Sequence, residues 1–191
     1  MDRREFLQTM TVSAAAATLA VNLGETAAAD EKPIKKEKIS MKKIIIAADP
    51  FAVTLKDAIV ADLKEKGGYE IVDVGSGKEI PYWEGAVAAS KLLQADPAAR
   101  GILFCGTGMG MSLIANRFKG VRACVVESVF AARMCRSIND SNALCLGSMI
   151  WGDWMAKEAV DVFLATKFTQ GLEQIADFLK DAEKKVDAIR P

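Results

Sequence analysis

The sequence predicts a Rossmann-like three-layer α/β/α sandwich built on a five-stranded parallel sheet. From about residue 42 onward, short apolar runs alternate with amphipathic stretches. The apolar runs are continuous rather than alternating, which is typical of strands that are buried on both faces of a parallel sheet. Strands regularly separated by helices, with right-handed crossovers, place helices on both faces of one sheet.

The expected elements follow one another in order along the chain. The first strand, at 44–48, is the continuous apolar run Ile-Ile-Ile-Ala-Ala. The helix after it carries apolar residues at helical spacing between 55 and 63, and Gly67 with Gly68 ends it. Each later strand is again a short apolar run, and each later helix has apolar residues on one face. These strands are expected at 69–74, 101–105, 121–126 and 143–146, and these helices at 83–93, 111–116, 128–137, 153–165 and 172–189.

The amino-terminal segment has the pattern of an export signal. Arg3 and Arg4 precede an alanine-rich apolar run, and small residues follow up to Ala29. The run is too short and too rich in alanine for a membrane anchor. We therefore expect a twin-arginine export signal at 1–29, a linker at 30–41, and one α/β domain with a C-terminal helix at 42–191. The mature protein would be periplasmic or extracellular, with no membrane contact after signal cleavage.

The composition restricts the chemistry that the chain can perform. The 25 basic and 25 acidic residues cancel, and no basic cluster stands out, so we expect no nucleic-acid partner. The chain has no histidine, which removes the commonest general base, the commonest zinc ligand, and any Ser-His or Cys-His catalytic pair. Its four cysteines form no CxxC pair, and burial as small apolar side chains is the ordinary role for three of them.

Ligands of such sheets bind beyond the carboxyl ends of the strands, where the strand order reverses. Each expected strand ends in a polar residue or a glycine. The strand ends that could contribute to a site are Asp49, Val74-Gly75, Cys105-Gly106, Glu127 and Gly147.

A glycine-rich turn, Gly106-Thr107-Gly108-Met109-Gly110, follows the third strand. It matches neither the Walker loop nor the dinucleotide fingerprint, which disfavours a nucleotide-dependent enzyme. Glycines let backbone amides approach an oxyanion, and the start of the next helix adds partial positive charge. The turn therefore suits an anionic substrate group or a charge that develops during reaction. Cys105, directly before it, could be a thiolate base or a buried structural cysteine.

Two blocks of the sequence resemble the ribose-5-phosphate isomerase B and galactose-6-phosphate isomerase family. The first is 101–112 with Ala115-Asn116-Arg117 and Gly120-Val121-Arg122-Ala123, and the second is Ala132-Arg133-Met134, Arg136, Asn139-Asp140-Ser141-Asn142 and Leu146-Gly147. The resemblance covers about 42–168. It implies isomerisation between aldose and ketose through an enediol, without a metal or another cofactor. It also implies a homodimer with sites near the interface.

The resemblance assigns a role to each predicted site residue. Cys105 would be the base that moves a proton between adjacent substrate carbons. Asp49 would bond substrate hydroxyls or shift the oxygen-bound proton, although it could instead cap the helix that follows. Asn139 could likewise only shape a turn. The other assigned residues are Thr107 and the amides of Gly106, Gly108 and Gly110, for the enediolate oxygen, and Asn116 with Asn139, for hydroxyls.

The chain departs from the family pattern at positions that, in the family, open the sugar ring and bind the substrate phosphate. Pro50 and Ile138 stand where the family has histidines, and the second of those histidines is assigned to ring opening. The family's phosphate-binding arginines are missing near Leu172. Arg136 could replace them or could pair at a surface. Glu127 could be a substitute acid or base, or a solvated glutamate at a helix start.

These departures predict an altered substrate. Ring opening must come from another residue, occur spontaneously, or be unnecessary because the sugar is already acyclic. Export also disfavours phosphorylated sugars, which are cytoplasmic metabolites. We therefore expect an aldose-ketose isomerase acting on an altered or unphosphorylated small-molecule sugar. The alternative is a catalytically inactive sugar-binding protein of the same fold.

Overall fold

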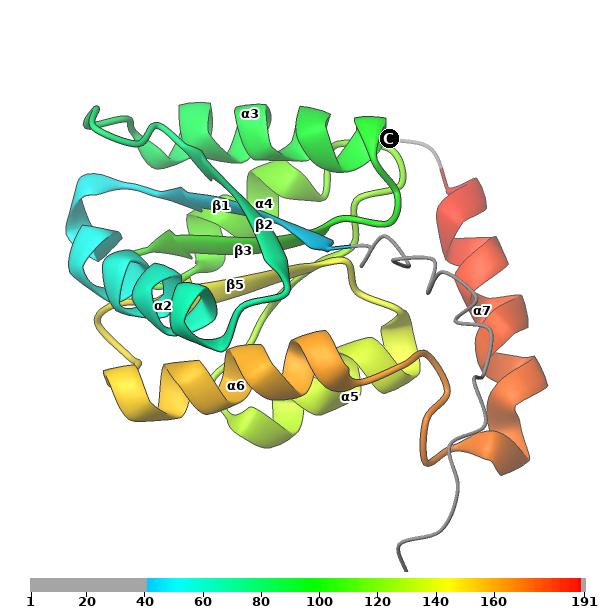
Figure 1. The fold of residues 1–191 in the computed structure, drawn as a ribbon. Coiled ribbons are helices and arrows are strands. Elements are labelled where there is room, and N and C mark those ends of the chain that lie inside the picture. Colours follow the sequence, from blue (N-terminus) through cyan, green and yellow to red (C-terminus); the bar gives the residue numbers. More distant parts are fainter. Residues whose placement is uncertain (1–40, 190–191) are drawn as a thin grey trace, which may run out of the picture. The chain divides into compact units, whose positions relative to one another are not determined.

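The computed structural model describes residues 41–189, and the predicted export signal and the linker up to residue 40 lie outside the described residues. Five parallel strands form one sheet in the order β2-β1-β3-β5-β4, with helices on both faces (Figure 1). The predicted Rossmann-like sandwich is thereby confirmed. The strands are β1 (Lys42–Ala48), β2 (Tyr69–Val74), β3 (Arg100–Cys105), β4 (Ala123–Val125) and β5 (Ala143–Gly147). The helices are α2 (Val53–Lys66), α3 (Tyr82–Ala95), α4 (Met109–Ala115), α5 (Val129–Asn139), α6 (Asp153–Ala165) and α7 (Ala176–Ala188), with 3-10 turns η1 (Pro50–Ala52) and η2 (Glu173–Ile175).

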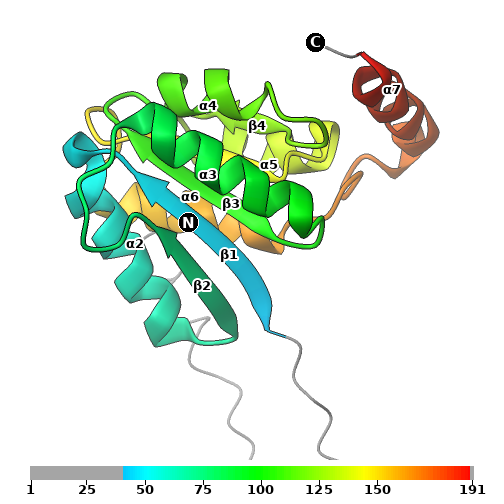
Figure 2. The same cartoon turned by 90° about the horizontal axis from the view of Figure 1, so that it is seen from above.

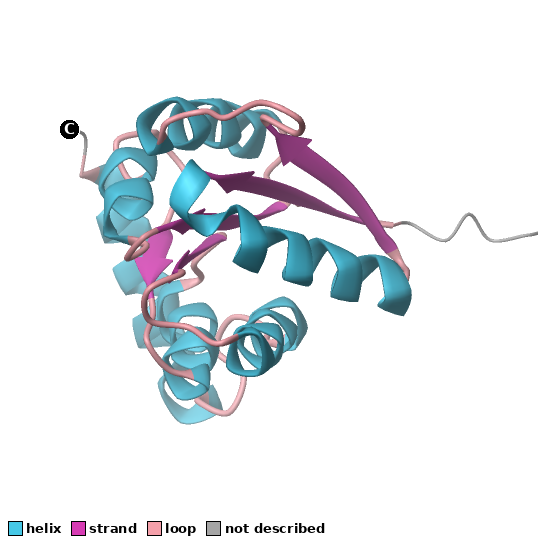
Figure 3. Cartoon of the chain, turned by 90° about the vertical axis from the view of Figure 1, so that its left-hand side faces the viewer, coloured by secondary structure: helices cyan, strands magenta, loops and turns pink. Residues whose placement is uncertain are grey.

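Helices lie on both sides of the sheet (Figure 3), and an apolar layer of buried side chains fills each side. Ile44 and Ile46 of β1 pack on the side of α2, α5 and α6, and Ile45 packs on the side of α3 and α4. All three side chains are completely buried. This two-sided burial explains why the strand is a continuous apolar run, and each such isoleucine contributes about 1.5–3 kcal/mol of burial energy.

The strand order reverses between β1 and β3. β1 pairs with β2 on one side and with β3 on the other, so the chain crosses from one half of the sheet to the other after α3. A crevice opens at such a switch point beyond the carboxyl ends of the strands. Ala48 pairs with Phe104 in this register, which places the residues after β1 beside the end of β3.

The helix ends follow local sequence signals. Gly67, at a φ of 69°, ends α2. Ser128 begins α5, because its hydroxyl accepts a hydrogen bond from the Ala131 amide at 3.1 Å. Asp140 ends α5 at a φ of 46°, a left-handed conformation that turns the chain toward β5. The turn before the fifth strand thus lies close to its predicted place.

The fourth strand is shorter than predicted at 121–126. The side chain of Asn142 accepts a hydrogen bond from the Arg122 amide at 2.8 Å, so a side chain rather than a strand neighbour satisfies this backbone group. The last helix also starts later than predicted, at Ala176, after the turn η2.

Helix α7 lies apart from the helices that cover the two faces of the sheet (Figure 2). Arg122 links it to the rest of the domain, since its guanidinium lies 3.2 Å from Glu183 and 3.0 Å from Asp187, and 2.7 Å from Asp140 before β5. Among residues 41–189, no helix is long and apolar enough to cross a membrane.

Candidate active site

The carboxyl ends of β1 and β3 bring together two of the predicted catalytic residues. Asp49 follows β1 directly, and its amide donates a hydrogen bond to the Phe104 carbonyl at 3.2 Å. Cys105 is the last residue of β3 and pairs with Gly147 at the end of β5. Both predicted groups therefore lie at the carboxyl edge, at the centre of the sheet.

The sulfur of Cys105 is joined to the glycine loop. Its Sγ accepts a hydrogen bond from the Gly108 amide at 3.1 Å. The residue is only 5% exposed and also contacts the apolar layer under α3 and α4. A backbone amide that already points at the sulfur is the kind of donor that a thiolate base, or a charge forming beside it, requires.

The loop itself is held by its close approach to the end of β5. A Cβ at Gly147 would lie 2.6 Å from the Cα and carbonyl carbon of Thr107. A Cβ at Gly108 would lie 3.1 Å from the Cys145 carbonyl, and Gly108 also has a φ of 79°. The Gly106 carbonyl accepts from the Met149 amide at 2.9 Å. Glycine is therefore required on both sides of this contact, which fixes the direction of the loop amides.

Asp49 combines a cap with a buried carboxyl. Its Oδ1 accepts from the Phe51 amide at 3.1 Å and so caps η1, which is the structural alternative weighed above. Burial raises the pKa of this carboxyl, while the amides of Phe51 and Ala52 oppose the rise. A carboxyl whose protonated form is favoured in this way is suited to carry a proton. The catalytic role stays a prediction.

Glu127 lies farther from the crevice. It follows β4, which is the edge strand of the sheet, and β5 stands between β4 and β3. Its side chain is exposed before the start of α5. The substitute acid or base role also stays a prediction.

Three predicted substrate-binding residues lie at the opposite, amino end of the sheet, where α4 and α5 finish. The side-chain Nδ2 of Asn116 donates a hydrogen bond to the Ala123 carbonyl, and its Oδ1 accepts one from the backbone amide of Ala123, both at 2.8 Å. Arg136 is buried, and its Nη1 donates to Asp140 at 2.7 Å and to the Ser141 carbonyl at 2.6 Å. Asn139 is exposed at the last position of α5. Within one chain, the fold does not bring these residues to Cys105.

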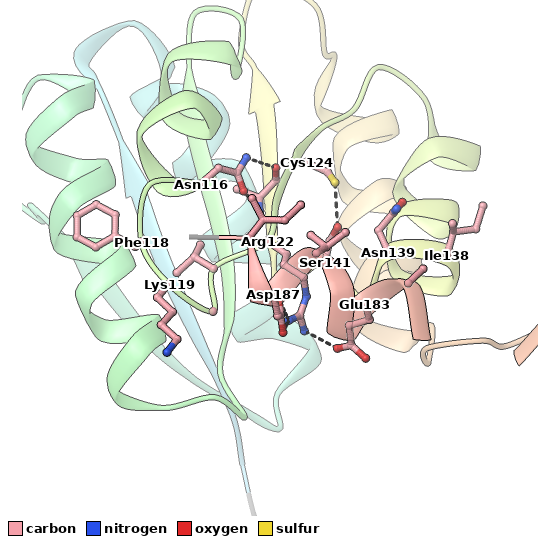
Figure 4. A pocket seen from close by; sticks show the side chains of 16 residues that line it. Asn116, Phe118, Lys119, Arg122, Cys124, Ile138, Asn139, Ser141, Glu183 and Asp187 are labelled. Carbon is pink, nitrogen blue, oxygen red and sulfur yellow. Dashed lines mark hydrogen bonds and ion pairs between the residues drawn. The ribbon is translucent and has the colours of Figure 1, made fainter. Parts of the chain in front are cut away.

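A cavity of about 770 Å³ lies at this amino end, between the segment 116–124 and α7 (Figure 4). Asn139 and Ile138 lie on its wall, together with Asn116 and Cys124. Glu183 and Val186 contribute from α7. Nothing in the sequence predicted this cavity, because it depends on where α7 docks.

Two further residues beside the glycine loop were missed by the sequence reasoning. A Cβ at Gly110 would lie 2.8 Å from ring carbons of Tyr82, and one at Gly106 would lie 3.3 Å from the terminal methyl of Met149. Both side chains are exposed. They flank the loop from α3 and from the turn after β5, and no sequence signal marks either position. In the part of the chain that the structure describes, no cluster of three or more acidic or cysteine side chains could hold a metal ion.

Comparison with known proteins decides the family. The family model for Ribose/Galactose Isomerase matches residues 44–177. The chain belongs to this family. It is 42% identical over 151 residues to the 4-deoxy-4-sulfo-D-erythrose isomerase of Clostridium sp. (strain MSTE9), covering 77% of this chain and 94% of that protein. It is 32% identical over 134 residues to the D-erythrulose-4-phosphate isomerase of Pectobacterium atrosepticum, covering 69% and 88%.

Solved structures of the family agree with the fold. The ribose 5-phosphate isomerase of Thermotoga maritima superposes with a TM-score of 0.69 at 35% identity, over 78% of this chain and 99% of that one. The predicted family is thereby confirmed, and with it the predicted class of enzyme, a sugar isomerase.

Proposed function

We propose that the chain interconverts an aldose and a ketose by proton transfer through an enediol, and that its substrate is an acyclic four-carbon sugar with an anionic group at C4. One observation carries this proposal. In a chain without histidine, the sulfur of Cys105 lies at the carboxyl end of β3 and accepts a hydrogen bond from the Gly108 amide.

The proposed reaction needs a base, a donor for the oxyanion, and a second proton carrier. Cys105 as thiolate would take the proton from the carbon beside the carbonyl, and the electrons would move onto the carbonyl oxygen. The loop amides would stabilise that oxygen by about 3 kcal/mol for each well-placed donor. Asp49 would move the oxygen-bound proton, and Cys105 would return its proton to the neighbouring carbon. No step requires an imidazole.

The missing histidines fit a substrate that has no ring to open. A four-carbon aldose closes a five-membered ring only through its C4 hydroxyl. A sulfonate or phosphate at C4 blocks that closure, so such a sugar stays open. The two relatives described above are named for four-carbon sugars substituted at C4. For such a substrate, the reaction needs no histidine at the positions of Pro50 and Ile138.

We also propose that the working enzyme is a homodimer. Within one chain, the glycine loop and the residues Asn116 and Asn139 lie at opposite ends of the sheet. A second copy could bring its amino-end residues to the carboxyl edge of this chain's sheet, which would add their polar groups to the proposed site. The oligomeric state can be measured by analytical ultracentrifugation.

Export remains part of the proposal. The pattern around Arg3 and Arg4 supports it. Replacing both arginines by lysine should keep the protein inside the cell, and an unchanged distribution would count against a twin-arginine signal.

Proton exchange tests the proposal directly. In deuterated water, 4-deoxy-4-sulfo-D-erythrose and D-erythrulose 4-phosphate should gain deuterium at the carbon beside the carbonyl, as followed by NMR. Cys105→Ser should abolish this gain. Absence of exchange with both sugars, from a folded sample, would refute the isomerase.

The inactive sugar-binding alternative gives a different result. It predicts that these sugars raise the Tm of the wild type and of Cys105→Ser equally, without turnover. Ribose 5-phosphate serves as the ring-forming control, and we expect it to exchange much more slowly.

A further inference from the structure

The base and the proton carrier of the proposed reaction lie on different segments of the chain. Cys105 ends β3, whereas Asp49 and the turn η1 follow β1. The two strands stay in register as far as Ala48 and Phe104, and the last bond between them joins the Asp49 amide to the Phe104 carbonyl at 3.2 Å. The ladder ends there, so the position of η1 relative to Cys105 depends on some other contact.

Ser148 makes this contact from the turn that follows β5. Its hydroxyl donates a hydrogen bond to the Phe51 carbonyl of η1 at 2.9 Å, although Ser148 lies 97 positions after Phe51 in the chain. Its backbone amide donates to the Cys105 carbonyl, also at 2.9 Å. One half-buried residue thus bonds both the segment that carries Asp49 and the strand end that carries the base.

The turn that carries Ser148 is itself fixed in place. The Met149 amide donates to the Gly106 carbonyl at 2.9 Å, and the indole Nε1 of the buried Trp151 donates to the Val126 carbonyl at 2.9 Å. Within the described range, 41–189, η1 has no second hydrogen bond to this turn. The Ser148 hydroxyl is therefore the bond through which the turn holds η1.

Asp49 would respond to a movement of η1. Phe51 accepts from Ser148 through its carbonyl, and its amide donates to the Asp49 carboxyl at 3.1 Å. Burial raises the pKa of that carboxyl, and the opposing amides of Phe51 and Ala52 belong to η1 and would move with it. If η1 were loosened, water would reach the carboxyl, and its pKa would fall toward the ordinary value of an aspartate.

We propose that Ser148 is a positioning residue of the active site, and that its hydroxyl, acting through Phe51, holds the Asp49 carboxyl in place relative to Cys105. This role rests on the proposed isomerase function and adds a residue to it. The two proton transfers of that reaction act on neighbouring atoms of one substrate. An error in the spacing of the two groups therefore slows the reaction even where the substrate is still bound.

A purely structural role for Ser148 predicts a different result. Its bond to Phe51 is exposed to water, and a bond of this kind adds little to the stability of a fold. If the bond only stabilised the domain, its loss would leave the rate of the folded enzyme unchanged. If the bond positions Asp49, its loss slows the folded enzyme.

The first measurement compares Ser148→Ala with the wild type at a temperature where both are folded. With 4-deoxy-4-sulfo-D-erythrose as substrate and NMR as the readout, we expect kcat to fall about tenfold. KM should change less than about twofold, because Ser148 acts on the transition state rather than on binding. Ser148→Thr keeps the hydroxyl and should restore most of kcat.

Thr166→Val is the matched control for the loss of a hydroxyl. The Thr166 hydroxyl also donates to a backbone carbonyl, that of Val162 at 2.6 Å, but it lies at the far end of α6. Valine has the same shape as threonine without the donor. This variant should leave kcat and KM unchanged.

The second measurement needs no turnover. Carbon NMR of the full chain, labelled isotopically at aspartate, gives the pKa of Asp49, and Asp49→Asn identifies its signal. We expect Ser148→Ala to lower this pKa, because the carboxyl becomes more hydrated. Ser148→Thr and Thr166→Val should keep the pKa of the wild type.

The proposal requires both changes in Ser148→Ala. An unchanged kcat would overturn it, and so would an unchanged pKa of Asp49, since Ser148 would then not act through that carboxyl. A kcat that falls equally in Ser148→Thr would also count against the hydroxyl. Failure of the isomerase function shows instead in the wild type, as absence of exchange with both sugars, and that result would overturn the positioning role together with it.

Discussion

Gly147→Ala tests the glycine loop without changing any atom of the loop itself. The new Cβ would lie 2.6 Å from two backbone atoms of Thr107 and 2.9 Å from the Gly106 carbonyl oxygen, whereas ordinary contacts begin at 3.4 Å. The loop must therefore retreat by roughly 0.8 Å. A misplacement of about 1 Å in an active site can cost about 100-fold in rate. We expect a loss of about 10- to 100-fold in kcat.

The same overpacking should also lower stability. Forced contacts of this kind cost about 1–3 kcal/mol, which corresponds to a fall in Tm of about 2 to 12 °C for a domain of this size. Gly152→Ala is the matched control, because nothing lies within 4 Å of a Cβ there. Deuterium exchange at a temperature where both variants are folded gives the readout. Equal exchange rates in the two variants would refute the role of the loop.

Three further changes separate catalysis from structure. Asp49→Asn keeps an oxygen for the Phe51 amide, so exchange should be lost while the fold is kept, whereas Asp49→Ala should also lose about 1 kcal/mol with the cap. The pKa of Asp49 is higher in the folded than in the unfolded chain, so this carboxyl stabilises the fold most at a pH below its unfolded pKa. The stabilisation is lost as the pH rises through the folded pKa. Over that pH window, the Tm of Asp49→Asn should therefore increase relative to that of the wild type. Asn116→Ala should lower the free energy of unfolding by about 1–3 kcal/mol in urea titrations, because Ala123 loses two partners. Arg122→Gln removes the ion-pair partner of Glu183 and Asp187 on α7, while Asp140 keeps Arg136, so the Tm should fall below that of the wild type in thermal denaturation.

Local signals were enough to predict the sheet and the glycine loop at its carboxyl edge. The run 44–48 is apolar at every position because both of its faces are covered, and that requirement is visible in the sequence. Gly106, Gly108 and Gly110 marked the loop, and Cys105 marked the strand end before it. Each of these features depends on neighbours in the chain, so the order of residues was sufficient to place them.

Features that depend on contacts across the fold could not be predicted in this way. The side chain of Asn116 bonds the backbone of β4, a partner that only the folded chain supplies, and its role toward a substrate hydroxyl stays a prediction. The same is true of Arg136, whose guanidinium binds Asp140 and the Ser141 carbonyl inside the domain.

The layout of the fold explains how the substrate could change while the reaction stayed the same. The groups for proton transfer, Cys105 with the loop up to Gly110, form one short segment held against β5. Of the positions that differ from the family pattern, Ile138 and the segment around Leu172 lie at the amino end of the sheet or beyond it, whereas Pro50 follows Asp49 at the carboxyl end of β1. In the proposed homodimer, substitutions at Ile138 or near Leu172 would change how the sugar is held in the partner's site without moving the loop amides. The proposed change of substrate would therefore require no rebuilding of the proposed base or of its donors.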